Sequence, residues 1–405
     1  MRLQPDSFVM AALLTALVAI APLSTDMYLP ALPAIGAYFT ATTAEVQLTL
    51  SVYLIGFAAG QLILGPLSDR HGRRPVLIGG LVIFLISTAA CVMANNITFL
   101  ITARFFQAIG ACAGAAVGRA VVRDIYDTKD AARLLAHMGT AMAAGPLVAP
   151  LIGGQLTVYY GWQSNFVALG ILSAILLLVT LMKLPESHTH RDFNALNPQR
   201  MVMNYTALMR NVDFRAFSFA NAFSFAGLFA FISGSSFVLI NGFGLDPEMF
   251  GFAFGAVVLG YMTGTQLAAY MLKTTEVERL VGIGGRIGLI AGHAGLLTVL
   301  VAPPSIFTII APMFCYTFAV GFVMPNSTAG AIAPFPHMAG AASALMGFIL
   351  MTLAATAGVL VGQLYNGTAV PMMAVIATTG TIAWIFAMRV EKQAETRALN
   401  PQKST

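Results

Sequence analysis

The sequence GPLSDRHGRRP, residues 65–75, places a short charged segment between two long apolar runs. The glycine and proline at its start interrupt a helix, and the glycine before its last two arginines permits a tight turn. Each flanking run is about 20 residues long, the length that a helix needs to cross about 30 Å of hydrocarbon. The segment is therefore expected to connect two membrane-spanning helices.

The composition of the whole chain agrees with this interpretation. Of its 405 residues 58% are hydrophobic and 9% are charged, whereas roughly a quarter of the residues of a soluble domain are charged. Only helices and closed barrels satisfy the backbone in lipid, and barrel-type alternation is absent. The sequence predicts an all-α membrane protein with about twelve spans. The first span begins near Phe8 and carries Asp26 and two prolines at its far end, so it is expected to be retained and not cleaved as a signal peptide.

Positive charge is distributed unevenly between the connections. Lys and Arg gather in alternate connections and in the tail, while the opposite connections hold none. By the positive-inside rule, both termini are expected to be cytoplasmic. No basic patch interleaves with aromatic residues, so nucleic-acid binding is not expected.

The longest connection, residues 184–213, is polar and basic and divides the chain into two halves. Six-helix bundles are expected at 1–183 and 214–392, followed by a cytoplasmic tail at 393–405. Met201, Tyr205 and Leu208 recur at helical spacing beside Arg200 and Arg210, which suits a short amphipathic helix on the cytoplasmic face. A disordered linker is the alternative. Two halves of six spans are common among secondary transporters.

The charged segment also matches a known signature. Its residues fit G-x-L-x-D-R-x-G-R-R/K, and the chain resembles the major facilitator superfamily over essentially its whole length. In the fourth span, Arg104, Gln107 and Gly110 match the family's intramembrane arginine motif. The segments TDMYLPALP and PFPHMAGAASAL resemble the Bcr/CflA subfamily of proton-coupled drug exporters. The matching residues of the charged segment are Gly65, Leu67, Asp69, Arg70, Gly72, Arg73 and Arg74.

The resemblance implies roles for two motifs. The charged segment would latch the two halves on the cytoplasmic side, with Arg123 and Asp124 as partners. The segment GPLVAPLIGG in the fifth span resembles the antiporter motif, but Ala149 stands where glycine is usual. Its small residues let another helix approach closely and its prolines bend the span, which suits a gate between the halves; plain helix packing is the alternative. The residues of this motif are Gly145, Pro146, Ala149, Pro150, Gly153 and Gly154.

Asp26 is the acidic residue that lies well inside a span. A carboxylate in hydrocarbon costs about 3 kcal/mol or more, so it is expected to face a cavity and to have a partner. If the first helix continues to about Tyr38, Asp26 lies about 18 Å from its outer end, and Arg104 lies about 12 Å deep. These depths predict a pair. Removal of Asp26 from water raises its proton affinity, whereas a nearby Arg104 lowers it, so a substrate that changes either influence can exchange with a proton. A static ion pair is the alternative.

Residues at helical spacing in other spans are candidates for an amphipathic cavity wall. Aromatic stripes in membrane helices also face lipid, and Arg119 also suits a snorkelling side chain. The candidates are Tyr28, Tyr53, Phe57, Gln61, Arg119, Asn221, Phe225 and Phe229.

The sequence thus predicts a proton-coupled multidrug efflux antiporter of the bacterial inner membrane that exports small amphipathic compounds by alternating access. A proton-coupled importer of a metabolite such as a nucleoside is the alternative. An enzyme is not expected, because HExxH, GxSxG and paired intramembrane carboxylates are absent. The expected partners are small-molecule drugs or metabolites, protons and lipid. No cofactor is expected, the proton gradient supplies the energy, and the resemblance implies a monomer.

Overall fold

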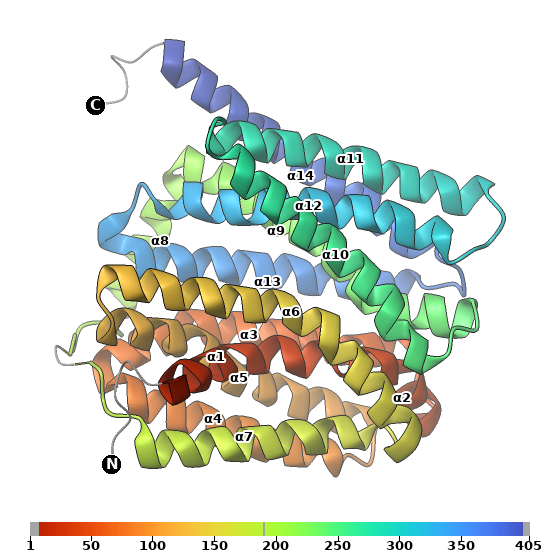
Figure 1. Cartoon of the computed structure of the whole chain (residues 1–405), viewed down its shortest axis with the longest axis horizontal. Coiled ribbons are helices and arrows are strands. Elements are labelled where there is room, and N and C mark those ends of the chain that lie inside the picture. Colours follow the sequence, from red (N-terminus) through yellow and green to blue (C-terminus); the bar gives the residue numbers. More distant parts are fainter. Residues whose placement is uncertain (1–7, 189–190, 400–405) are drawn as a thin grey trace. The chain divides into compact units, whose positions relative to one another are not determined.

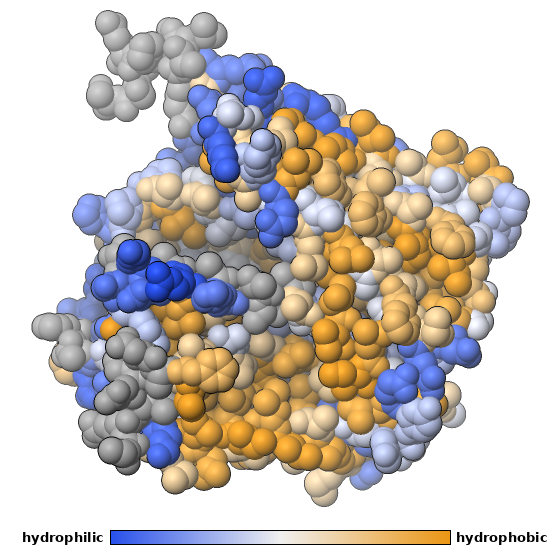
Figure 2. Space-filling view, viewed as in Figure 1, coloured by the Kyte–Doolittle hydropathy of each residue, from blue (hydrophilic) through white to orange (hydrophobic). Residues whose placement is uncertain are grey.

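The computed structural model describes residues 8–188 and 191–399. Within these residues the regular structure is helical, and 12 helices are long and apolar enough to cross a membrane. The predicted all-α membrane fold is confirmed. Large apolar side chains such as Ile171 and Ile290 are 59% and 67% exposed. Hydrophobic side chains spread along α7 (Gln163–Lys183) and α11 (Val277–Val301) between more polar helix ends (Figure 2). This distribution is that of helices whose outer faces contact lipid.

The chain folds as two compact units. Unit 1 comprises residues 1–201 with 246–252, and unit 2 comprises 202–245 with 253–405. The division between them falls inside the connection at 184–213. The segment at 246–252 groups with unit 1 because glycines remove the side chains at its contact with α6 (Thr128–Tyr160): Gly154 lies against the backbone of Pro247, and Gly251 lies against Leu151.

Six spans build unit 1, and their helices run roughly parallel to one another in Figure 1. The first span consists of three pieces, and the chain begins and ends these six spans at the same end of the unit. The elements are α1 (Phe8–Asp26), η1 (Leu29–Ala31), α2 (Leu32–Phe39), α3 (Thr43–His71), α4 (Arg73–Val92), α5 (Ile97–Ile125), α6 (Thr128–Tyr160) and α7 (Gln163–Lys183).

The first span is broken directly after Asp26. The expectation of one continuous helix to about Tyr38 was wrong. Pro30 has no N–H to donate to the carbonyl of Asp26, and Pro33 has none for Leu29, so two helical hydrogen bonds in succession are lost. The chain forms a turn at 27–28 and one 3₁₀ turn before it returns to helix. Asp26 therefore lies at the end of a helix, beside a break.

Helix α5 packs against α1, α3 and α4 at the centre of unit 1. Glycines make these contacts close: Gly114 lies against the backbone of Leu17 in α1, and Gly110 lies against Phe84 in α4. Gly56 of α3 lies against the carbonyl of Phe105. A methyl group at any of these positions would overlap backbone atoms. Small residues thus bring the side chains of α5 within reach of three neighbouring helices.

The remaining elements lie mainly in unit 2. Helix α14 continues past 392, where the bundle was expected to end and the tail to begin. The elements are α8 (Pro198–Arg210), α9 (Val212–Ser236), the π-helical turn η2 (Phe237–Gly242), α10 (Pro247–Met271), α11 (Val277–Val301), α12 (Phe307–Ile332), η3 (Pro336–Met338), α13 (Ala339–Leu364) and α14 (Val370–Leu399).

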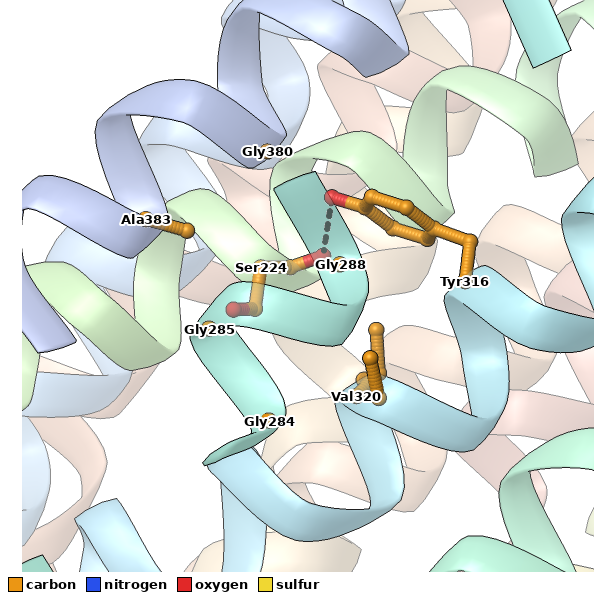
Figure 3. Close-up of a pocket in the computed structure, with 9 residues that line it drawn as sticks. Ser224, Gly284, Gly285, Gly288, Tyr316, Val320, Gly380 and Ala383 are labelled. Atoms are coloured by element: carbon orange, nitrogen blue, oxygen red, sulfur yellow. Dashed lines mark hydrogen bonds between the residues drawn. The ribbon is translucent and has the colours of Figure 1, made fainter. Parts of the chain in front are cut away.

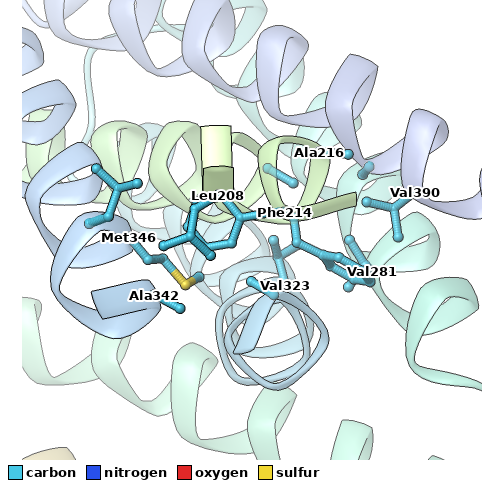
Figure 4. Close-up of a cluster of buried hydrophobic side chains, with 13 residues drawn as sticks. Leu208, Phe214, Ala216, Val281, Val323, Ala342, Met346 and Val390 are labelled. Carbon is cyan, nitrogen blue, oxygen red and sulfur yellow. The ribbon is translucent and has the colours of Figure 1, made fainter. Parts of the chain in front are cut away.

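Helix α8 is the amphipathic element of the long connection, and it docks on unit 2. Its Leu208 is fully buried in a cluster with Phe214, Ala342 and Met346 (Figure 4). Tyr205 packs against the same cluster. The second half of the connection is therefore ordered and belongs to unit 2, because one face of α8 completes the apolar core there.

Candidate functional site

Arg104 is the central polar residue of unit 1 and is 0% exposed. Its Nη1 donates to the carbonyl and hydroxyl oxygens of Ser24 at 3.1 and 3.0 Å, and to Oε1 of Gln107 at 2.6 Å. Nε2 of Gln107 donates in turn to Oγ1 of Thr88 at 2.8 Å. Hydrogen bonds through this one guanidinium therefore tie α1, α5 and α4 together.

Aromatic rings surround the same guanidinium. Cζ of Arg104 lies 4.3 Å from the ring centroid of Tyr53, 4.7 Å from that of Tyr28 and 5.8 Å from that of Phe166. The hydroxyl of Tyr28 shares a hydrogen bond of 2.9 Å with Oγ1 of Thr49. Cation–π contacts are strongest where the cation is desolvated. The three rings therefore offset part of the cost of removing this charge from water.

Asp26 is buried close to this centre but does not pair with it. Its side chain accepts a hydrogen bond of 3.0 Å from the hydroxyl of Thr25, and the residue is 5% exposed. Both residues are described, and no ion pair joins Asp26 to Arg104. The predicted pair is not formed in this structure, because the helix ends at Asp26 and Nη1 of Arg104 is engaged by Ser24. Nε and Nη2 of Arg104 have no hydrogen-bond partner among the residues that the structure describes.

Asp26 and Arg104 are thus buried without an ion pair between them. Each needs other groups to offset the cost of removing its charge from water. A protonated Asp26 is neutral and tolerates its position, whereas an ionised one needs a counter-charge or water. Arg104 carries two free donor nitrogens that match a carboxylate. Unit 1 thus holds a buried carboxyl group at the end of α1 and a buried guanidinium in α5 with two nitrogens that have no described partner.

The antiporter-motif residues pack against the break in the first span. Gly153 of α6 lies directly on the backbone of Met27, and Ala149, one turn earlier, is fully buried. Gly145 faces open space. The close contact predicted for the small residues of α6 is therefore made by Gly153, next to Asp26. Pro146 and Pro150 lie inside α6, which continues through both of them.

The candidate cavity residues fall into two groups. Tyr28 and Tyr53 belong to the rings around Arg104, while Phe57 is buried one turn along α3 and Gln61 is half-buried. In unit 2, Nδ2 of Asn221 donates to Oγ1 of Thr328 at 3.3 Å, and the rings of Phe225 and Phe229 lie 6.4 Å apart. Arg119 is exposed. A role in cavity lining stays a prediction for the residues outside the Arg104 centre.

Three of the expected latch residues meet at one end of unit 1. Arg73 forms ion pairs with Asp69 and with Asp124, where Nε lies 2.9 Å from Oδ2. Its Nη1 also donates to Oγ of Ser68 at 2.7 Å. Arg70 and Arg123 form no ion pair with a described residue. The charged segment is thus organised around Arg73 within unit 1, and its action on the other half stays a prediction.

Glu186 is a member of this network that the sequence did not indicate. Its carboxylate accepts hydrogen bonds from the backbone N–H groups of Arg73 and Arg74, at 2.8 and 3.2 Å, and so caps the start of α4. Gly72 has a φ of 102°, and a side chain there would occupy the position of this carboxylate. Sequence rules for helix caps are local, so a cap supplied from the end of the sixth span could not be found with them.

Unit 2 has a neutral residue where unit 1 has Arg104. Tyr316 in α12, the fourth span of the second half, donates from its hydroxyl to the carbonyl of Ser224 in α9, the first span, at 3.3 Å (Figure 3). Arg104 and Ser24 form the corresponding contact between the fourth and first spans of unit 1. A small cavity lined by Gly284, Gly285, Gly288, Gly380 and Ala383 adjoins Tyr316. Both contacts join the fourth and the first span of a unit, and only the contact in unit 1 involves a charged side chain.

Comparison with known proteins establishes the family. A model of the Major Facilitator Superfamily matches residues 14–359. The chain belongs to this superfamily. It is therefore a multi-pass membrane transporter of small molecules and not an enzyme. The solved structure of the xylose transporter XylE from E. coli shares the fold, with a TM-score of 0.72 and 14% identity, covering 94% of this chain and 97% of XylE.

Three curated relatives span most of the chain. The uncharacterized MFS-type transporter YdgK of Bacillus subtilis is 31% identical, over 93% of this chain and 94% of its own length. A bicyclomycin resistance protein homolog of Haemophilus influenzae is 26% identical, over 92% and 94%. The multidrug transporter MdfA of Yersinia pestis is 28% identical, over 82% and 81%.

Proposed function

We propose that this transporter is a proton-coupled efflux antiporter of the Bcr/CflA type in the bacterial inner membrane, and that it exports small amphipathic compounds. The observation that carries the proposal is a buried carboxyl, Asp26, two residues along α1 from Ser24, whose oxygens accept hydrogen bonds from the buried guanidinium of Arg104. The names of the relatives in Haemophilus influenzae and Yersinia pestis, which refer to bicyclomycin and to multiple drugs, support the cargo class. The proton gradient is the proposed energy source, without a cofactor.

Proton exchange at Asp26 follows from its surroundings. Among the residues that the structure describes, the side chain of Asp26 has a hydrogen bond only with the hydroxyl of Thr25, which suits a neutral, protonated carboxyl. Loss of the proton creates a charge that must be matched by Arg104, by water or by a cationic group of the cargo. Cargo that occupies this place therefore competes with the proton, and competition for one site is sufficient for antiport.

The break at residues 27–31 supplies the movement. Pro30 has no N–H for the carbonyl of Asp26, and the N–H of Ala31 donates to Tyr28 in a 3₁₀ turn, so the helical hydrogen bond from residue 30 to Asp26 is missing. Gly153 presses α6 onto Met27 in the same segment, so a change in the packing of α6 is transmitted to Asp26. We infer that access to the site and the charge of Asp26 change together.

Transport into proteoliposomes tests the direction of coupling. Chloramphenicol and tetraphenylphosphonium are offered to liposomes that carry the purified protein and a pH gradient of either sign. An antiporter accumulates these compounds when the lumen is acidic, because protons leave as cargo enters. Accumulation only with an acidic exterior would instead support the importer, and Asp26→Asn should abolish accumulation in either case.

A further inference from the structure

Two arginines near the C-terminal end of α5 are exposed. Arg119 and Arg123 are separated by one helical turn, and they lie about 9 Å and about 3 Å along the axis from the end of the helix at Ile125. The residues between them are buried, including Val121 and Val122. The two guanidinium groups therefore project from the same side of an otherwise buried turn.

Neither arginine has a partner among the residues that the structure describes. Arg73, Arg133 and Arg200 of unit 1 form ion pairs, whereas Arg119 and Arg123 form none and donate no hydrogen bond to a described residue. The adjacent carboxylate does not neutralise them, since Asp124 is bound by Arg73 at 2.9 Å. It also accepts from the hydroxyl of Ser187 at 3.4 Å.

Like charges one helical turn apart repel each other and destabilise the helix that carries them. Guanidinium groups present planar forks of donors that match the two oxygens of a carboxylate or a phosphate. An oxyanion between the two arginines would remove the repulsion and satisfy both forks. No carboxylate of the described chain takes that place.

We propose that Arg119 and Arg123 form a binding site for an oxyanion, a carboxylate or phosphate group that belongs either to the cargo or to an anionic lipid headgroup. The identification of such a group as part of the cargo rests on the proposed export function, but the site itself does not. Its distance from the proton site, about 22 Å along α5 from Arg104, makes the two separately testable.

Chemical labelling of arginine side chains tests the site in the wild-type protein. No substitution is needed for this test, so an effect on folding does not complicate the result. The protein is placed in nanodiscs of phosphatidylcholine, or of phosphatidylcholine with phosphatidylglycerol, and treated with phenylglyoxal. Mass spectrometry then gives the labelling rate of each arginine with decyl phosphate, or with decanol as the uncharged match. Arg279, which is exposed and has no described partner, is the internal comparator.

Decyl phosphate at ten times its dissociation constant should slow labelling of Arg119 and Arg123 by about tenfold and leave Arg279 unchanged. Slow labelling in phosphatidylglycerol discs without added ligand would identify the lipid headgroup as the source. Protection by decyl phosphate in phosphatidylcholine discs alone would identify a free oxyanion. Equal effects on all three arginines, or none on any of them, would overturn the proposal.

Two variants complete the design. In Arg119→Gln, protection of Arg123 should be lost, whereas in the matched variant Arg279→Gln it should persist. In Asp26→Asn, protection of both arginines should be the same as in wild type. If the tests of Asp26 refute proton coupling, the labelling result for Arg119 and Arg123 therefore still stands. If the labelling refutes the oxyanion site, the tests of Asp26 are not affected.

Discussion

At the scale of single residues, Arg104 is a fully buried cation with rings and neutral acceptors around it and no carboxylate. Removing one partner from such a group leaves it with an uncompensated desolvation cost. The rings of Tyr28 and Tyr53 are therefore expected to contribute to stability through their faces. Their hydroxyls serve mainly to hold the rings in place, through Thr49 and through the carbonyl of Ala21.

Substitution of Tyr53 separates the ring from its hydroxyl. Tyr53→Phe keeps the face over Arg104 and loses one hydrogen bond, at a cost of about 1 kcal/mol or less in unfolding free energy. Tyr53→Leu also loses the cation–π contact and should cost about 2 kcal/mol more. Thermal unfolding in detergent, followed by the fluorescence of Trp162 and Trp384, compares the two. Equal melting temperatures would show that the ring face does not support Arg104.

The sequence predicted the two key residues of the centre but not their relationship. Asp26 and Arg104 were identifiable because charge inside a span is costly and therefore rare. Their depths along two helices were compatible with a pair. The side chain of Arg104 instead donates to Ser24, near the end of the first helix. The end of this helix at Asp26 was not predicted from the sequence. The ring of Phe166 comes from α7, and nothing in its local sequence indicated a contact with a cation.

At the scale of elements, the contact between α6 and the broken first span is the feature most sensitive to a single methyl group. A Cβ at Gly153 would overlap the backbone of Met27, whereas a Cβ at Gly145 would meet open space. Both glycines belong to the same motif of the same helix. They therefore form a matched pair for testing whether this contact controls Asp26.

Gly153→Ala should force α6 away from the break and cost about 1–3 kcal/mol in unfolding free energy. Transport should fall with it, because Asp26 loses its fixed position. Gly145→Ala should retain both stability and transport. The melting temperature and pH-gradient-driven uptake of chloramphenicol give the two readings. If both variants behave alike, the Gly153 contact has no special role.

The capping of α4 by Glu186 provides a second prediction for an element. Glu186→Ala removes the acceptor for the N–H groups of Arg73 and Arg74, at a cost of about 1 kcal/mol. Hydrogen exchange of these two amides should then become about fivefold faster. Gly72→Ala should have a similar effect, because its methyl group displaces the carboxylate. Glu395→Ala, at an exposed position, is the control, and unchanged exchange in Glu186→Ala would refute the cap.

The breaks and caps mark the limit of prediction for elements. The spans themselves follow from long apolar runs, and the start of α5 follows from Asn96, whose side chain caps it. Pro30 and Pro33 indicate an interruption of the first span. The conformation of the interrupted segment also depends on Gly153 of α6, which packs closely against Met27. Residues far apart in sequence determined the outcome there, and periodicity does not report such contacts.

At the scale of the whole molecule, composition and the long apolar runs predicted a helical membrane protein, and the long polar connection at 184–213 predicted its two halves. The boundary between the halves was harder to place. The start of the long connection is bound to unit 1, where Glu186 caps α4 and the N–H of Asp192 donates to the carbonyl of Asp69 at 3.1 Å. Its end is bound to unit 2 through Leu208. Polar composition alone does not show that one connection is divided between two cores.

The orientation of the chain in the membrane is a prediction from its charge distribution. Lys and Arg gather in alternate connections, so both termini should be cytoplasmic. A green fluorescent protein fused after Thr405 should be fluorescent, and an alkaline phosphatase fused at the same place should be inactive. Fusions of both reporters after residue 95, in a connection without Lys or Arg, should give the reverse. The same result at both positions would contradict the predicted orientation.

The central claim is that Asp26 is the site where proton and cargo compete. Its most direct test is proton release on adding chloramphenicol or tetraphenylphosphonium to the detergent-purified protein in weak buffer, followed with a pH-sensitive dye. The account predicts release from wild type and none from Asp26→Asn, with Asp130→Asn, whose side chain is 49% exposed, behaving as wild type. Release that persists in Asp26→Asn would place the coupled proton elsewhere and contradict the account.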